Sequence, residues 1–370
     1  MWGDIAIAFM IAFMTAFMAT PHTIKLAKKL GAVDTPQDAR RINKITMPRL
    51  GGLAVILGFF VSVGYLLVVM SIEKNIDLYQ DNYIRKLLGF VIGAFIIGIT
   101  CFIDDIKGVP ALVKLFAQIL AAIVVIKCGI KIDNLDIPFL KLENQSNIFY
   151  IIITLFWIVG ITNAMNLIDG LDGLSTGISI ISCFSLLIIF SLNGSPLISI
   201  VLITALGGAL VGFLPYNFNP AKTFIGDTGS NFLGYCLSII SILGIAKTYT
   251  AIVIVAPLIV FALPLFDTTF AIIRRLIHGK SLKAIIEPDA GHLHHKMLQK
   301  GFTQKQAVLI LYGVSATFGM FAIILMESGI WKALSFALII IAIIAMGYKE
   351  FFKQRLLEDT DEDSEIEENK

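Results

Sequence analysis

Polar side chains gather in a few short groups along an otherwise apolar chain, and the first group is a pair of adjacent carboxylates. Asp104 and Asp105 end an apolar stretch, and Lys107 and Lys114 follow them. Two neighbouring carboxylates do not both ionise cheaply unless a cation or a proton compensates them. The pair therefore predicts a site for a divalent metal, or for a base close to phosphate, with the lysines supplying positive charge to phosphate oxygens. A solvated interfacial loop would explain such a pair if it stood alone.

A second group repeats polar residues at every third position, namely Asn163, Asn166, Asp169 and Asp172. Neighbouring members of this series share one side of a helical or 3₁₀ turn. Their amide and carboxylate oxygens are hard ligands of the kind that Mg²⁺ accepts. Helix capping would explain one or two of these residues but not four in register, so the group indicates a functional site.

A third group centres on Asp227, which stands between Gly226 and Gly229 just before an apolar run. This order predicts a carboxylate beside backbone N–H groups near a helix N-terminus, where phosphate and its metal are favoured. An N-cap turn, in which Asp227 and Ser230 bond to the backbone alone, is the alternative.

Three of the five histidines, His292, His294 and His295, form the fourth group. Neutral imidazole suits Zn²⁺, but no cysteine accompanies these residues. With lysines and arginines nearby, they are better suited to donating hydrogen bonds to phosphate oxygens. The fifth group is the basic segment from Arg40 to Arg49, for which the positive charge of a cytoplasmic loop is a sufficient explanation.

The elements that carry these groups are membrane helices. Of 370 residues, 57% are hydrophobic and 15% are charged, and the mean hydropathy is +0.84, which excludes an ordinary water-soluble protein. The net charge of +2 gives no indication of nucleic-acid binding. Eight acidic residues lie in the last thirteen positions, so the remainder is basic and suits an anionic membrane surface or a phosphorylated substrate. The four cysteines show no CxxC spacing and indicate neither a disulfide framework nor a zinc site.

Eleven apolar stretches are long enough to span a bilayer. They cover roughly residues 2–20, 50–70, 87–103, 112–127, 148–164, 174–192, 197–214, 230–246, 249–270, 306–326 and 330–348. We therefore expect an all-α, polytopic integral membrane protein with about eleven transmembrane helices. Residues 1–348 form the transmembrane domain, and residues 349–370 form an acidic cytoplasmic tail with too few apolar residues to fold.

The basic residues predict the orientation. If the N-terminus lies outside, with the first stretch retained as an anchor, the inside segments hold 21 of the 29 lysines and arginines. This bias predicts a cytoplasmic C-terminus and places all five polar groups on the cytoplasmic side. An ion-coupled transporter is the alternative, but it would carry charges near the bilayer midplane, where Asp267 is the main example. An enzyme working at the inner membrane surface is therefore favoured.

Several long motifs in a fixed order make the chain resemble a known enzyme family. Between about Arg40 and Lys300 they read PRLGG, DDIKG, NAMNLIDGLDGL, FNPAKTFIGDTGS, FDTTFAIIRR and HLHHKML. Together they resemble the polyprenyl-phosphate N-acetylhexosamine-1-phosphate transferases, which include the phospho-N-acetylmuramoyl-pentapeptide transferases. The HLHH motif and the preceding Asp289 resemble the branch that transfers GlcNAc-1-phosphate to initiate teichoic acid, O-antigen or a similar polymer.

The resemblance implies a reaction and its partners. Undecaprenyl phosphate would accept GlcNAc-1-phosphate from UDP-GlcNAc, giving undecaprenyl-diphospho-GlcNAc and UMP, with Mg²⁺, or Mn²⁺ in its place, as cofactor. This would be the first lipid-linked step of a cell-envelope polymer. The enzyme would lie among the lipids of the bacterial plasma membrane with its active site facing the cytoplasm, and a homodimer is left open.

The resemblance also implies residue roles. Asp227 would be the principal metal ligand and Asn166 a second. Asp104 and Asp105 would lie at the reacting phosphates, with Asp104 acting either as a base or as an orienter of the acceptor. The other catalytic residues that it implies are Lys114, Asp169, His294 and His295. The substrate-binding residues that it implies are Lys44, Asn163, His292 and, around the uridine, Leu167, Asp172, Asn217 and Phe224.

Three positions depart from the pattern of the GlcNAc branch, namely Asn43, Ala290 and Gly291. They leave the sugar selectivity and the role of Lys44 open. The acceptor phosphate is largely ionised at neutral pH, since a phosphate monoester has a second pKa of about 6. Direct attack therefore needs no strong base, and we favour it over a covalent intermediate on an aspartate.

Overall fold

The computed structural model describes residues 2–35, 46–72, 82–132, 146–245, 251–279 and 291–343, and these residues are almost all helical. The helices are α1 (Trp2–Leu30), α2 (Gly52–Ile72), α3 (Tyr83–Lys107), α4 (Ala111–Lys127), α5 (Asn147–Leu167), α6 (Leu174–Leu192), α7 (Leu197–Asn217), α8 (Gly226–Ile245), α9 (Ala251–Val260), α10 (Ala262–Gly279), α11 (Leu293–Gln299) and α12 (Gln304–Ser328). A further apolar helix covers Ile330–Ile343. Two short strands, β1 (Val33–Asp34) and β2 (Met47–Pro48), pair antiparallel.

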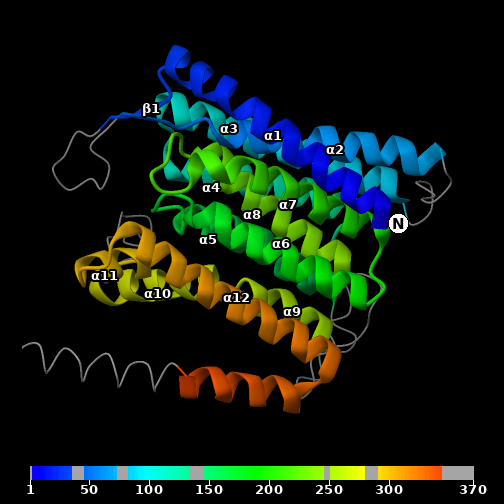
Figure 1. Cartoon of the computed structure of the whole chain (residues 1–370). Coiled ribbons are helices and arrows are strands. Elements are labelled where there is room, and N and C mark those ends of the chain that lie inside the picture. Colours follow the sequence, from blue (N-terminus) through cyan, green and yellow to red (C-terminus); the bar gives the residue numbers. More distant parts are fainter. Residues whose placement is uncertain are drawn as a thin grey trace, which may run out of the picture.

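Helices α7 and α8 form the centre of the bundle. Helix α7 packs against α1, α2 and α6, and α8 packs against α5, α3 and α2. In Figure 1 the blue helices α1 and α2 lie on one side, α12 and the Ile330–Ile343 helix lie on the other, and α5 to α8 run between them. The hydrophobic core accordingly follows α7 and α8, where almost every side chain is buried.

Small residues let the helix backbones approach one another closely. A Cβ on Gly208 would lie 2.4 Å from the carbonyl oxygen of Phe9, and one on Gly212 would lie 2.3 Å from that of Phe13. Helix α1 therefore packs directly on the backbone of α7. Close backbone packing of this kind is typical of membrane proteins, in which helix association depends on van der Waals contact and interhelical hydrogen bonds.

Seven helices are long and apolar enough to cross a membrane among the residues that the structure describes, namely α1, α2, α3, α5, α6, α7 and α12. This confirms an all-α polytopic membrane protein. The predicted number of eleven spans is not confirmed, because helices α4, α8, α9 and α10 and the helix at Ile330–Ile343 are not among these seven. The tail over residues 349–370 lies outside the described part of the chain.

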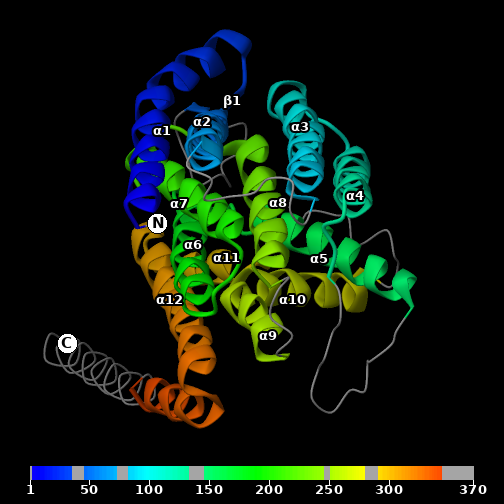
Figure 2. The same ribbon diagram turned by 90° about the vertical axis from the view of Figure 1, so that its right-hand side faces the viewer.

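The prediction of one continuous span over residues 249–270 is wrong, because the chain breaks there into α9 and α10. Pro264 has no N–H to donate to the carbonyl of Val260, so an unbroken helix would lose a hydrogen bond and clash at that point. The break falls at Phe261, and Pro264 lies in the first turn of α10, where proline is tolerated. Figure 2 shows α10 turning across the bundle, away from the direction of α9.

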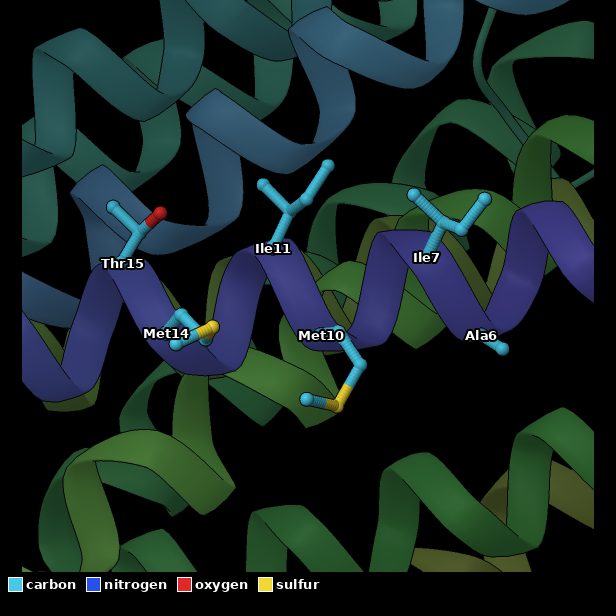
Figure 3. A pocket seen from close by; sticks show the side chains of 6 residues that line it. All are labelled: Ala6, Ile7, Met10, Ile11, Met14 and Thr15. Carbon is cyan, nitrogen blue, oxygen red and sulfur yellow. The ribbon is translucent and has the colours of Figure 1, made fainter.

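The outer surface of the bundle is apolar and suits contact with lipid. On α1 the side chains of Met10, Met14 and Met18 are all more than half exposed. Part of this face forms a shallow apolar hollow of about 450 Å³ (Figure 3), lined by Ala6, Ile7, Met10, Ile11, Met14 and Thr15. The polar groups found in the sequence lie elsewhere, at the ends of the helices.

Candidate active site

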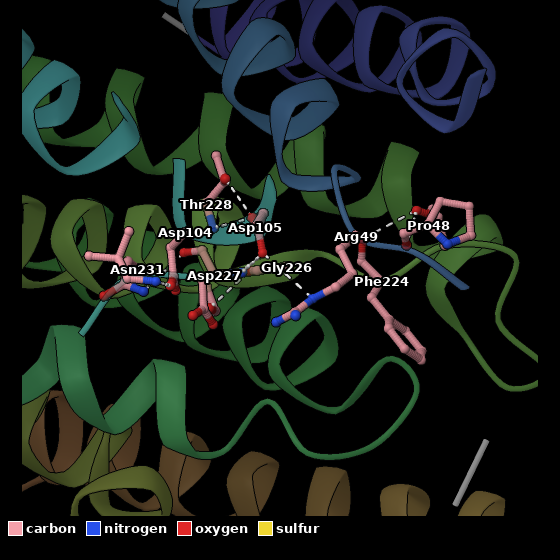
Figure 4. Close-up of polar contacts among 12 residues, drawn as sticks. Pro48, Arg49, Asp104, Asp105, Phe224, Gly226, Asp227, Thr228 and Asn231 are labelled. Atoms are coloured by element: carbon pink, nitrogen blue, oxygen red, sulfur yellow. Dashed lines mark hydrogen bonds and ion pairs between the residues drawn. The ribbon is translucent and has the colours of Figure 1, made fainter. Parts of the chain in front are cut away.

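An ammonium between two carboxylates marks the centre of the site. Nζ of Lys114 lies 2.8 Å from Oδ2 of Asp104 and 2.7 Å from Oδ2 of Asp227. Asp104 belongs to the last turn of α3, Lys114 to the first turn of α4 and Asp227 to the first turn of α8. Three helix ends therefore meet at one cation (the two carboxylates are labelled in Figure 4).

The turn between α3 and α4 explains how Asp104 and Lys114 come to face each other. Gly108 ends α3 with a φ of +72°, a conformation that suits glycine, and its N–H donates to the carbonyl oxygen of Asp104 at 2.8 Å. The N–H of Val109 donates to Oδ1 of Asp104 at 2.6 Å. Pro110 then begins α4. The turn thus holds the Asp104 carboxylate by one oxygen and leaves the other to Lys114.

Asp105 binds the N-terminus of α8. Its carboxylate accepts hydrogen bonds from the N–H of Asp227 at 3.0 Å, and from the N–H and the hydroxyl of Thr228 at 2.9 and 2.6 Å. Nε of Arg49 lies 3.7 Å from the same carboxylate. An acidic side chain is favourable at these unpaired N–H groups, and Asp105 is only 5% exposed. Through these bonds Asp105 holds the backbone at Asp227 in place. A direct catalytic role for Asp105 stays a prediction.

The start of α8 is also fixed by the start of α2. A Cβ on Gly229 would lie 2.7 Å from the Cα of Gly52, so the two helices touch through glycine. The N–H groups of Gly51 and Gly52 donate to the carbonyls of Phe224 and Ile225 at 3.0 and 2.8 Å. This contact brings the segment of Arg49 against Asp105 and Gly226 (Figure 4).

Asn166, at the end of α5, completes the surroundings of Asp227. Its Nδ2 donates to Oδ1 of Asp227 at 3.0 Å and to Oγ of Ser230 at 2.8 Å. Both residues predicted as metal ligands are therefore in contact. Among the described residues no group of three His, Cys, Asp or Glu side chains could hold a metal. Two carboxylates and an amide do not form an all-protein metal centre, but they fit Mg²⁺, which usually binds one or two carboxylates together with substrate phosphates.

The loop between α5 and α6 carries the two remaining carboxylates of the second group. Ser175 donates to Oδ1 of Asp169 at 2.5 Å. Burial raises the pKa of Asp169 to about 7, and the charge of Asp227 raises it further while Ser175 and Arg49 oppose the rise. The charges of Asp227 and Arg49 are thus close enough to Asp169 to shift its pKa.

Asp172 faces a different segment. Its Oδ2 accepts from Nδ2 of Asn219 at 3.0 Å and from the N–H of Ala221 at 3.1 Å. Its Oδ1 is buried and has no hydrogen-bond partner in the structure. A buried carboxylate oxygen without a partner is costly, which is consistent with a predicted role in binding a polar group of the substrate.

Among the other predicted uridine-binding residues, Asn217 uses its side-chain amide in hydrogen bonds within the protein. Thr176 donates to its Oδ1 at 2.6 Å, and its Nδ2 donates to the carbonyl of Thr223 at 3.0 Å. Its side chain therefore holds the loop before α8. Leu167 and Phe224 are both partly exposed, and Lys44 lies outside the described residues, so binding roles for these three stay predictions.

The histidines reach the same end of the bundle through α11. Nδ1 of His292 lies 2.9 Å from Oδ2 of Asp267 on α10, and the N–H of Leu293 donates to Oδ1 of Asp267 at 2.8 Å. Helix α11 is thus anchored by its first residues to α10. The His292 and His294 rings are nearly parallel, and the His294 and His295 centroids are 4.3 Å apart.

His294 packs on the loop that carries Asp169. A Cβ on Gly170 would lie 2.1 Å from Nε2 of His294, so the ring occupies the space that a side chain would fill. Burial lowers the pKa of His294 to about 4, with a further decrease from the charge of His295. The ring is therefore neutral at physiological pH, and its buried Nδ1 has no hydrogen-bond partner in the structure.

Sequence reasoning missed four side chains that support the site, namely Arg49 as the partner of Asp105, Asp267 as the partner of His292, and the buried amides Gln118 and Asn231. A signal existed for the two amides. Gln118 follows Lys114 by four residues and Asn231 follows Asp227 by four, so each lies one helical turn beyond a site residue.

Asn163 lies with these amides and not at the surface of the site. Its Nδ2 donates to Oε1 of Gln118 at 2.6 Å and to the carbonyl of Val159 at 2.8 Å. The predicted contact of Asn163 with substrate therefore stays a prediction, and the structure shows a different set of partners for it.

Comparisons with known proteins identify related enzymes. The model of the family described as glycosyl transferase family 4 matches residues 87–245. A probable undecaprenyl-phosphate N-acetylglucosaminyl 1-phosphate transferase of Bacillus subtilis is 39% identical over 342 residues, 92% of this chain and 90% of that protein. A decaprenyl-phosphate N-acetylglucosaminephosphotransferase of Mycobacterium tuberculosis is 35% identical, with 84% of this chain and 79% of that protein covered.

A member of the other branch matches over a shorter length. A phospho-N-acetylmuramoyl-pentapeptide-transferase of Staphylococcus epidermidis is 35% identical over 63% of this chain and 74% of that protein. The matched region of the family model includes Asp104, Lys114, Asn166, Asp169 and Asp227. These likenesses show that the chain belongs to the polyprenyl-phosphate sugar-phosphate transferases of glycosyl transferase family 4.

Proposed function

We propose that the protein transfers GlcNAc-1-phosphate from UDP-GlcNAc to undecaprenyl phosphate, giving undecaprenyl-diphospho-GlcNAc and UMP. The observation that carries this proposal is the convergence of Lys114, Asp104, Asp227 and Asn166 at one end of the bundle. The likeness to the Bacillus subtilis protein over nine-tenths of both chains supports the choice of sugar and lipid.

The reaction exchanges one phosphoanhydride bond for another. An oxygen of the lipid phosphate attacks the phosphorus that carries GlcNAc, and the bond from that phosphorus to the oxygen of UMP breaks, so UMP leaves with the electron pair. Such a displacement depends mainly on positioning and on neutralising the phosphates. In this proposal Lys114 neutralises phosphate oxygens, Asp104 orients Lys114, and the neutral His294 offers a ring nitrogen beside Gly170.

We include Mg²⁺ in the proposal as the cofactor, held by Asp227 with Asp104 and Asn166 nearby. Bound there, it would supply positive charge to the pyrophosphate of the donor and to the leaving UMP. The donor set of carboxylate and amide oxygens suits Mg²⁺ or Mn²⁺ better than Zn²⁺, because these are hard oxygen ligands whereas Zn²⁺ is usually bound by cysteine and histidine.

The proposed topology has an outside N-terminus and an active site that faces the cytoplasm. In support, α1 ends in Lys28 and Lys29 at the same end of the bundle as the site. Two lysines at opposite ends of α12 provide a matched test in a cysteine-free background. An impermeant thiol reagent added to intact cells should label Lys332→Cys and spare Lys300→Cys, and the reverse pattern would overturn the orientation.

Transfer of phospho-N-acetylmuramoyl-pentapeptide is the second candidate, because the Staphylococcus epidermidis enzyme is also similar. The test is an assay of the purified protein with undecaprenyl phosphate and radiolabelled UDP-GlcNAc or UDP-MurNAc-pentapeptide, with and without Mg²⁺. We expect labelled lipid from UDP-GlcNAc alone, and none after chelation of the metal. If labelled lipid forms only from UDP-MurNAc-pentapeptide, the chain belongs to the other branch. If activity in chelator equals activity with Mg²⁺, the reaction does not need the metal.

A further inference from the structure

A closed set of three amide side chains lies one helical turn beneath the active site. Nε2 of Gln118 donates to Oδ1 of Asn231 at 2.8 Å, and Nδ2 of Asn163 donates to Oε1 of Gln118 at 2.6 Å. Gln118 is 2% exposed and Asn231 is 1% exposed. We call these three residues the amide cluster.

Each member of the amide cluster belongs to a helix that carries a residue of the site. Gln118 shares α4 with Lys114, and Asn163 shares α5 with Asn166. Asn231 shares α8 with Asp227, and its Nδ2 donates to the carbonyl of Asp227 at 2.9 Å. The spacing of three or four residues puts each amide on the same helix face as its site residue.

The amide cluster therefore links the three helices at a second level. At the first level, Lys114 and Asn166 both bind the Asp227 carboxylate, but these contacts must change when a charged substrate enters. At the second level, neutral amides hold one another where no substrate phosphate reaches them, and buried amide pairs have a high cost if one partner is lost. Such a layer can keep the three helix ends in register while the charged groups above exchange partners.

We infer that Gln118, Asn163 and Asn231 are positioning residues, which set the distance between the Lys114 ammonium and the Asp227 carboxylate for catalysis. This inference rests on the proposed function of the site above the cluster. None of the three side chains touches the reacting atoms. They act through the helix faces that they share with Lys114, Asn166 and Asp227.

Gln118→Met is the most selective variant. Methionine fills a similar volume but lacks the amide, so the hydrogen bonds of Gln118 to Asn163 and to Asn231 are all removed. Asn163 keeps its bond to the carbonyl of Val159, and Asn231 keeps its bond to the carbonyl of Asp227. The variant should therefore fold with α4 no longer tied to α5 and α8 at this level.

The control is Ser238→Ala on α8. Ser238 lies seven residues after Asn231, on the same helix face, and its buried hydroxyl donates to the carbonyl of Tyr235 at 2.8 Å. The substitution removes a buried polar bond of the same helix without touching the amide cluster. Comparison with it separates the effect of positioning from that of a general loss of stability.

The first measurement is steady-state kinetics of purified variants. We expect Gln118→Met to lower kcat about 10- to 100-fold, the cost of a small displacement of catalytic groups, with KM for UDP-GlcNAc nearly unchanged. Because the amides act as a unit, Gln118→Met combined with Asn231→Leu should be no slower than the worse single variant. A kcat equal to that of Ser238→Ala, or effects that multiply in the double variant, would overturn the inference.

The second measurement needs neither substrate nor metal. Hydrogen exchange of the peptide that covers the first turn of α8, Gly226–Asn231, should be faster in Gln118→Met than in the wild type or Ser238→Ala. Unchanged exchange there would overturn the inference as well. If the wild type shows no turnover with UDP-GlcNAc, the proposed function fails, and the exchange result still decides whether the amide cluster fixes α8.

Discussion

Lys114 and Asp227 form an ion pair of 2.7 Å between the first turns of α4 and α8. The same ammonium binds Asp104 at 2.8 Å, so one positive charge compensates two carboxylates in a partly buried site. A divalent metal ion would compensate the same two carboxylates. Lys114 thus binds both carboxylates, and we expect it to bind phosphate oxygens once substrate enters.

Lys114→Met should make the protein depend on Mg²⁺ for stability. Without the ammonium, Asp104 and Asp227 face each other uncompensated, and a partly buried charge that loses its partner is strongly destabilising. We expect a lower melting temperature in chelator than for the wild type, and a larger increase when Mg²⁺ is added. Lys107→Met, at an exposed lysine of the neighbouring turn, is the control. An equal response to Mg²⁺ in Lys114→Met and wild type would contradict the prediction.

Asp227→Asn should abolish turnover while the protein still inserts and folds. Asparagine keeps the shape of the side chain and one of the two oxygens that accept from Lys114 and Asn166, but it removes the negative charge that a divalent cation needs. The measurement is product formation across a Mg²⁺ titration, with the melting temperature as the check on folding. Activity at the wild-type level in this variant would count decisively against Asp227 as the metal ligand.

The sequence singles out the polar groups because each is a short run of chemically unusual residues at the end of an apolar stretch. Asp104, Lys114, Asn166 and Asp227 do come together, as their shared side of the membrane required. The spacing of residues along one helix does not reveal which side chain of another helix they contact. Asn163 was therefore expected at the substrate although it bonds to Gln118, and Asn217 was expected to face uridine although Thr176 and Thr223 occupy its amide.

The fold shows the same division between local and long-range information. Apolar length predicted the positions of α1 to α3, α5 to α7 and α12, because a membrane helix needs a minimum number of apolar residues. The break at Phe261 was missed, because the stretch from 249 to 270 is mostly apolar and Asp267 is its one charged residue. Pro264 was the available signal, and Asp267 reaches His292 because the new helix α10 changes direction there.

Gly170→Ala should reduce turnover by displacing His294. The new methyl group would lie 2.1 Å from Nε2 of His294, so the ring must leave its place against Gly170. Gly160→Ala is the matched control, since a Cβ at Gly160 on α5 meets no atom within 4 Å. We expect kcat to fall about 10-fold or more in Gly170→Ala and to stay at the wild-type level in Gly160→Ala. Equal activity of the two variants would show that the position of His294 does not matter for the reaction.

Stability should depend on pH through Asp169. Its pKa is raised from 3.8 to about 7 by burial, so the folded protein binds a proton that the unfolded chain releases at lower pH. The folded state therefore binds more protons than the unfolded state between these values, and its stability should fall as the pH rises from about 4 to about 7.

Asp169→Asn tests this dependence, because asparagine cannot ionise and keeps an oxygen that accepts from Ser175. The variant should lose the part of the pH dependence between about 4 and 7 that Asp169 contributes. Its melting temperature should consequently exceed that of the wild type by more at pH 8 than at pH 5. Ser175→Ala should shift the wild-type decrease to higher pH, because the Ser175 hydroxyl lowers the pKa of Asp169 by binding the ionised form. Parallel melting curves for wild type and Asp169→Asn across this range would show that Asp169 is ionised throughout, and that Arg49 and its other neighbours compensate its charge fully.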